Sequence, residues 1–188
     1  MTSFHLVDVF ATERYAGNQL AVVESRGHLD DETMQAVASE MDFSETTFVE
    51  SEGDTADLGG TGPTESPPRS DPPTARVRIF TPEAEIPFAG HPTLGTAHVI
   101  REQVADGRPD EVVLDLNVGE VPVEARTVDG TETLWMTQQP PAFGETLAHD
   151  DLAELLSLDT GSLDGDWPVQ VVSTGLPTVV VPLADREA

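Results

Sequence analysis

A strand, a sharp turn and a helix start follow one another in the segment FTPEAEIPFAGHPTLGTAH, which runs from Phe80 to His98. The two prolines of the turn exclude a helix across it, because proline lacks the amide hydrogen that a helix interior requires. The residues Gly90-His91-Pro92-Thr93 then predict a helix start, with Gly90 or His91 at the cap position and proline in the first turn. This segment therefore predicts a strand, a tight turn and a helix in close succession.

The predicted helix start is also the first candidate functional feature. A helix that begins on a glycine beside a histidine presents free backbone N–H groups and the positive end of its dipole to whatever lies in front of it. Such an arrangement suits a carboxylate ligand. Local sequence alone is equally compatible with an ordinary strand–helix connection that has a capping histidine.

The first 42 residues predict a hairpin followed by a helix. Two β-prone runs within residues 4–24 flank the turn signal Ala16-Gly17-Asn18, where Asn18 is either a left-handed turn residue or part of a site. Apolar residues at helical spacing follow, with Asp30 or Asp31 as the predicted cap and an end near Asp42.

Glu45 is the second candidate functional residue. It stands where the predicted helix gives way to a strand, between Phe43 and Phe48 and beside two threonines. A carboxyl group held partly out of water by such neighbours suits a proton shuttle. The alternative is a solvated glutamate at a loop edge, which is a common outcome in a chain with 35 acidic residues.

Residues 50–75 differ in composition from the rest of the chain. They are rich in proline, glycine, serine and threonine and poor in large apolar residues, which predicts a solvated, disordered insertion between two neighbouring strands. The remaining predicted elements are strands at 111–116, 119–128, 134–136, 169–173 and 178–182, and a short helix capped at 149–151 that presents Leu152, Leu155 and Leu156 on one face.

The charge of the chain excludes two classes of partner. Its net charge is -26, and the nine basic residues are all arginine. Such a field repels nucleic acids and anionic membrane surfaces. Acidic residues spread along the whole sequence, together with the lack of lysine, indicate a surface adapted to high salt.

We therefore predict that the chain gains structure as salt is added, because cations screen the self-repulsion of its carboxylates. Circular dichroism from dilute buffer to molar salt checks this. Full structure in dilute buffer, unchanged by salt, would contradict the prediction.

The lack of cysteine excludes disulfides, thiolate catalysis and cysteine metal sites. A metal site through His91 and Glu45 is not expected either, because no third ligand has a usable spacing. The sequence shows neither a membrane-spanning apolar run nor a signal peptide before Phe4, so we expect a soluble cytoplasmic protein.

Four segments occur in an order that is more specific than any one of them: VDVFATERYAGNQLAVVE, MQAVASEMDFSETTFVE, RVRIFTPEAEIPFAGHPTLGTAH and STGLPTVVVPL. Together they resemble the PhzF-like family, named for the phenazine-biosynthesis isomerase, over nearly the whole chain apart from residues 50–75. The resemblance implies an α+β, diaminopimelate-epimerase-like fold, in which each of two halves wraps a curved mixed sheet around a central helix. It implies a complete first half at 1–128 and the opening part of a second half at 129–188.

The resemblance also implies a function. Members of the family are isomerases that move a proton on a small unsaturated carboxylate without a cofactor. By position, Glu45 is the acid/base and His91 the second catalytic residue, while Asn18, Gly90 and Thr93 are candidates for substrate binding. The family's relatives are longer, so a homodimer or a complementary C-terminal half is a possible partner.

Two alternatives compete with this function. Amino-acid epimerases of the same fold resemble two-base enzymes with paired cysteines, but Ala89 occupies the cysteine position here, which argues against that chemistry. The other alternative is a truncated, non-catalytic relative that binds a small carboxylate or a partner subunit.

Overall fold

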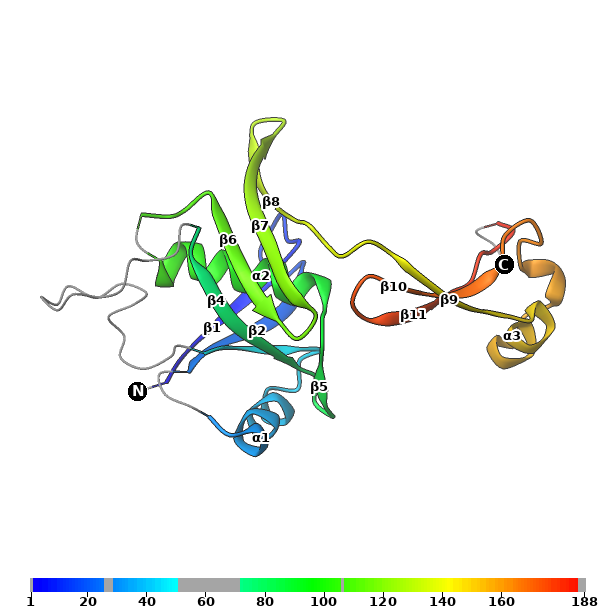
Figure 1. Cartoon of the computed structure of the whole chain (residues 1–188), viewed down its shortest axis with the longest axis horizontal. Coiled ribbons are helices and arrows are strands. Elements are labelled where there is room, and N and C mark those ends of the chain that lie inside the picture. The colour runs from blue at the N-terminus through cyan, green and yellow to red at the C-terminus, as the bar shows by residue number, and fades with distance from the viewer. Residues whose placement is uncertain (1, 26–28, 51–71, 106, 186–188) are drawn as a thin grey trace, which may run out of the picture. The chain divides into compact units, whose positions relative to one another are not determined.

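The computed structural model of the chain describes residues 2–25, 29–50, 72–105 and 107–185 (Figure 1). It forms two compact units, Met1–Thr137 and Gln138–Ala188. Most of the predicted insertion, residues 51–71, lies outside the described residues. Its two ends do not belong to a loop, because Glu50 ends one strand and Thr74 begins the next.

The first unit contains β1 (Ser3–Val9), β2 (Asn18–Ser25), α1 (Asp31–Met41), β3 (Thr46–Glu50), β4 (Thr74–Phe80), β5 (Glu85–Ile86), α2 (Gly90–Val99), the π-helical turn η1 (Ile100–Val104), β6 (Glu111–Leu116), β7 (Gly119–Val128) and β8 (Thr131–Met136). Its strands form one mixed sheet in the order β1-β2-β3-β4-β6-β7-β8, with β5 added to β4. β2 runs parallel to β3 and β4 parallel to β6, whereas the other neighbours are antiparallel.

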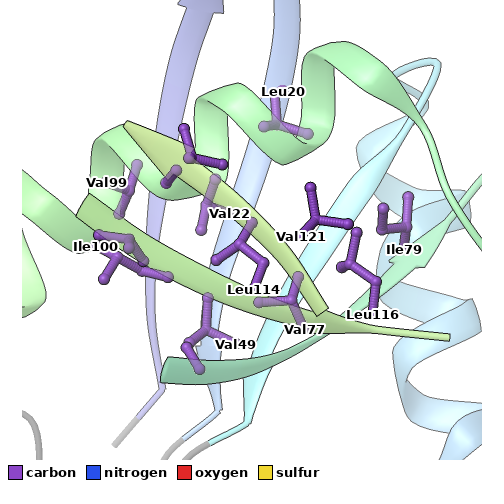
Figure 2. Close-up of a cluster of buried hydrophobic side chains, with 14 of the residues drawn as sticks. Leu20, Val22, Val49, Val77, Ile79, Val99, Ile100, Leu114, Leu116 and Val121 are labelled. Atoms are coloured by element: carbon purple, nitrogen blue, oxygen red, sulfur yellow. The ribbon is translucent and has the colours of Figure 1, made fainter. Parts of the chain in front are cut away.

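The two helices pack on opposite faces of this sheet. Because successive side chains of a strand point to opposite faces, Val22 and Val23 belong to different clusters. Val23 and Phe48 pack against Met34 of α1, whereas α2 lies against the larger, inner cluster (Figure 2). The labelled members of that cluster are Leu20, Val22, Val49, Val77, Ile79, Val99, Ile100, Leu114, Leu116 and Val121. The inner cluster is the main core of the unit, and it holds α2 in place.

α1 begins and ends as its sequence predicts. The Asp30 side chain accepts a hydrogen bond of 2.8 Å from the backbone N–H of Thr33, which satisfies one of the free donors of the first turn. Asp42 closes the helix in the left-handed conformation, and Thr46 begins β3 four residues later. This short connection places Glu45 at the start of a strand.

The structure decides between the two roles left open for Asn18, and its first compact unit is longer than the first half expected from the sequence. Asn18 is not a left-handed turn residue: it is the first residue of β2 and pairs with Val9, while Phe10 and Tyr15 of the preceding loop have positive φ. The predicted boundary at 128/129 falls inside the β7–β8 hairpin, and the compact unit extends to Thr137 because β8 pairs with β7 along its whole length.

The second unit is a small three-stranded sheet with one helix. It contains β9 (Ala142–Leu147), α3 (His149–Leu156), the 3₁₀ turn η2 (Thr160–Ser162), β10 (Val169–Ser173) and β11 (Pro177–Val180), with β10 between the two other strands. β9 was not predicted from the sequence. The helix is capped at Ala148, not within 149–151, and of its three predicted apolar residues Leu155 and Leu156 are exposed. The core of the second unit is formed instead by Ala153, Leu163 and Val169.

No helix in the described ranges is long and apolar enough to cross a membrane.

A partly buried ion pair fixes the short strand β5, which leads into α2. Arg78 donates two hydrogen bonds to Glu85, from Nε to Oε1 at 2.8 Å and from Nη2 to Oε2 at 2.6 Å, and Asn117 donates a third at 2.9 Å. The Arg78 guanidinium holds the pKa of Glu85 below its usual range, and Asn117 acts in the same direction. This cluster ties β4, β5 and the β6–β7 turn together.

Glu85→Gln is therefore expected to lower the free energy of unfolding at pH 7 by about 1–2 kcal/mol, because it removes a charge-assisted bidentate contact. A carboxyl group whose pKa is lowered by folding stabilises the fold above its unfolded pKa of about 4.3, and this contribution is lost as the pH falls through the folded pKa. The difference between wild type and variant should thus shrink in acid. Urea denaturation at pH 7, 5 and 3.5 measures it.

Glu120→Gln is the matched control, because Glu120 is exposed on β7. A difference between Glu85→Gln and wild type that stays constant across this pH range would contradict the assigned role of the Glu85 carboxylate.

Candidate active site

Three segments of the first unit meet at one end of α2. Asn18 begins β2, Glu45 immediately precedes β3, and His91 is the second residue of α2. The sheet register explains the meeting, because the first residue of β3 pairs with the last residue of β4, Phe80, and with Ala21 near the start of β2. We call this group of Asn18, Glu45, Gly90 and His91 the site rim.

The His91 imidazole lies between the two other side chains of the site rim. Its Nδ1 atom is 3.2 Å from Nδ2 of Asn18, and its Nε2 atom is 3.4 Å from Oε2 of Glu45. The His91 side chain is 10% exposed and the Glu45 side chain 17%. The imidazole thus links an amide on one strand to a carboxylate on another.

The contact between His91 and Glu45 is an ion-pair distance without hydrogen-bond geometry. Both Nε2 of His91 and Oε2 of Glu45 are buried, and neither has a hydrogen-bond partner within the described residues. Buried polar atoms are nearly always hydrogen-bonded in folded proteins, because leaving one unpaired is costly. The two atoms therefore face each other with unused hydrogen-bonding capacity that a third group can engage.

The first turn of α2 supplies a second polar element. Ala89, and not Gly90 or His91 as predicted, occupies the cap position, and no side chain hydrogen-bonds to the turn as a cap. The turn also contains no acidic residue. Its free N–H groups and the positive end of the helix dipole favour an anion in front of Gly90.

Gly90 also sits close to another element. A Cβ atom added at this position would lie 3.3 Å from Cε of Met136. A side chain at this position would require that methyl group to shift by a few tenths of an ångström, so Gly90 packs closely against β8.

Thr93 is placed differently from the other predicted site residues. It is fully buried, and its hydroxyl donates a 2.7 Å hydrogen bond to the carbonyl oxygen of Ala89. The structure therefore brings together Asn18, Glu45, Gly90 and His91. The Thr93 hydroxyl instead stabilises the first turn of α2 through its hydrogen bond to Ala89.

Sequence reasoning missed a polar contact that fixes α2 against the sheet. Thr47 and Thr96 are both fully buried, and their hydroxyl oxygens are 2.7 Å apart. A Cβ at Gly95 would lie 2.6 Å from Cδ2 of Leu20, which shows how closely the helix approaches β2. The helical spacing of Thr93 and Thr96 was a sequence signal that could have pointed to a polar helix face turned inward.

In the described part of the chain, no three histidine, aspartate or glutamate side chains gather as a metal site would require.

The curved mixed sheet around a helix is the diaminopimelate-epimerase-like fold, and solved epimerase structures share it. The chain belongs to the phenazine biosynthesis-like (PhzC-PhzF) family, whose sequence profile matches residues 7–188. The family and fold expected from the four sequence segments are thereby confirmed.

Individual relatives agree with this assignment. The chain is 35% identical to an uncharacterised isomerase of Mesorhizobium japonicum, over 99% of the chain and 57% of that protein. It is 34% identical to a trans-2,3-dihydro-3-hydroxyanthranilate isomerase of Pseudomonas aeruginosa, over 97% of the chain and 58% of that protein. The structure of a predicted epimerase of Pseudomonas aeruginosa matches with a TM-score of 0.75 and 32% identity, over 96% of the chain and 58% of that protein. The chain thus spans a little over half the length of the relatives it matches.

Proposed function

We propose that the protein acts as a cofactor-independent isomerase that moves a proton on a small unsaturated carboxylate. The observation that carries this proposal is the contact between the Glu45 carboxylate and the His91 imidazole at the start of α2, where buried Oε2 and Nε2 lie 3.4 Å apart. A proton shuttle needs one group that can both accept and return a proton, and a glutamate provides this. The isomerase names of the relatives supply the reaction class.

In the proposed reaction Glu45 removes a proton from one carbon of the substrate. The electrons of the broken C–H bond enter the unsaturated system and shift its double bond. The protonated Glu45 then delivers the proton to another carbon, where a new C–H bond forms. Substrate and product have the same atoms and the same oxidation level, so the step consumes no oxidant or reductant.

The other elements of the site rim would bind and polarise the substrate. The Nε2–H group of His91 can donate a hydrogen bond toward negative charge that develops between the two proton transfers. The free N–H groups of the first turn of α2 can hold the substrate carboxylate beside Gly90. Hydrogen bonds that exist before the reaction starts need no rearrangement during it, which favours catalysis.

The proposal is tested by proton exchange. The purified chain is incubated in D₂O with trans-2,3-dihydro-3-hydroxyanthranilate, the compound in the name of the Pseudomonas relative, and deuterium in the recovered material is measured by mass spectrometry. Incorporation at a ring carbon, with conversion to an isomer, supports the proposal. Binding of the compound by calorimetry without any exchange would favour a carboxylate-binding protein without catalysis.

A further inference from the structure

We propose that Asn18 is a positioning residue that fixes which nitrogen of His91 carries the proton. The catalytic benefit of this role rests on the proposed function, whereas the position of the proton on His91 follows from the structure alone. It gives Asn18 a role that differs from the substrate contact expected from the sequence.

The assignment follows from the chemistry of the two groups that flank the imidazole. Nδ2 of Asn18 is an amide nitrogen, which can donate hydrogen bonds but not accept them. It lies 3.2 Å from Nδ1 of His91, so Nδ1 must act as the acceptor. A neutral imidazole carries one proton, which is therefore on Nε2, the atom that faces Oε2 of Glu45 at 3.4 Å.

The opposite tautomer would put two acceptors face to face. A bare Nε2 atom and the Glu45 carboxylate would then direct lone pairs at each other inside a poorly solvated contact. The imidazole would also lose its ability to donate toward the substrate from Nε2. Asn18 prevents this arrangement by occupying Nδ1 with a donor.

The backbone that carries Asn18 is itself held firmly. Asn18 pairs with Val9 at the start of the β1–β2 ladder. The N–H group of Gly17 donates a 3.2 Å hydrogen bond to Oδ2 of Asp8. A Cβ at Gly17 would lie only 2.4 Å from the carbonyl oxygen of Val9, so the turn accepts only glycine without rearrangement. The backbone position of Asn18 is therefore fixed by strand pairing and by a tight turn, and its amide contacts His91 from there.

The test is the ¹⁵N spectrum of the His91 ring, recorded by long-range ¹H–¹⁵N correlation on the full 188-residue chain at neutral pH. His91→Gln assigns the signals among the five histidines. We expect a protonated Nε2 and an unprotonated Nδ1 in the wild type. Asn18→Asp replaces the donor with an acceptor, so a proton should appear on Nδ1, and Asn18→Ala should give averaged signals from both tautomers.

Gln19→Ala is the matched control, because it removes a neighbouring amide that points to the other face of the strand. Its His91 signals should equal those of the wild type. A wild-type His91 protonated on Nδ1, or an unchanged ¹⁵N pattern in both Asn18 variants, would overturn the inference.

The deuterium-exchange assay separates this inference from the proposed function. If both hold, Asn18→Ala should lower kcat by up to about 100-fold with a smaller change in KM, because a misdirected hydrogen bond affects the transition state most. A raised KM with unchanged ¹⁵N signals would show instead that Asn18 contacts the substrate. If the wild type shows no exchange, the proposed function fails, whereas the ¹⁵N spectra still decide the role of Asn18.

Discussion

Glu45→Gln is expected to reduce deuterium exchange into the substrate by about 100-fold or more, and to leave the fold intact. The change keeps the size and shape of the side chain but replaces the carboxyl group, which accepts and returns the proton, with an amide that cannot. General acid–base groups contribute roughly 10²- to 10⁴-fold to rates, which sets the scale of the loss. Exchange is followed by mass spectrometry, and the fold by circular dichroism.

Glu50→Gln provides the matched control for this variant. Glu50 ends the same strand that Glu45 precedes, so the two substitutions remove the same charge at opposite ends of β3. Exchange in the control should stay near the wild-type rate. Exchange at that same rate in Glu45→Gln would exclude Glu45 as the base and would require another proton carrier at the site rim.

Arg101→Ala is expected to lower the free energy of unfolding by about 2–4 kcal/mol. The Arg101 side chain is 1% exposed. Its Nε donates a 2.6 Å hydrogen bond to the carbonyl oxygen of Pro109, and its Nη1 a 3.2 Å bond to Glu132. Truncation leaves a cavity in the core and removes the donor from a carbonyl that depends on it.

Urea denaturation measures this loss, and Arg126→Ala is its control. Arg126 is half exposed on β7, where it contacts Glu124 and the ring of Trp135. Exposed ion pairs contribute about 0–1 kcal/mol, so its removal should have a small effect. Equal losses in the two variants would show that burial of Arg101 does not matter to the fold.

The sequence predicted the elements of the site because each has a local signal. The glycine–histidine–proline run marks the start of α2, and the Asp30 cap marks the start of α1. Alternating burial along β6 follows the alternating sequence of 111–116. The family resemblance added the expectation that these elements converge, and the structure places Asn18, Glu45 and His91 together.

Other features could not be predicted because they depend on pairing between distant residues. The contact between Asn18 and His91 joins residues 73 positions apart and follows from the register of three strands. The sequence around Arg101 gives no sign that its side chain is buried, because its partners Pro109 and Glu132 come later in the chain. A local sequence pattern does not show which distant residues a turn or a hairpin will place in contact with it.

β9 illustrates the same limit for a whole strand. The residues Ala142–Leu147 have no alternating apolar pattern and include a glycine in the middle. The strand exists because it pairs with β10, where a Cβ at Gly144 would lie 3.2 Å from Cβ of Val171. Pairing with a neighbour overrode a weak local preference.

The opposite placement of α1 and α2 follows from the handedness of the chain. Connections between parallel strands of one sheet are almost always right-handed, and both the β2–α1–β3 and β4–α2–β6 connections advance in the same direction across the sheet. β4 runs antiparallel to β3, so the same handedness puts the second helix on the other face. The first crossover ends, and the second begins, at the Thr46–Phe80 pair. A glutamate at the end of one crossover and a histidine at the helix start of the next therefore face each other as a consequence of chirality and strand direction.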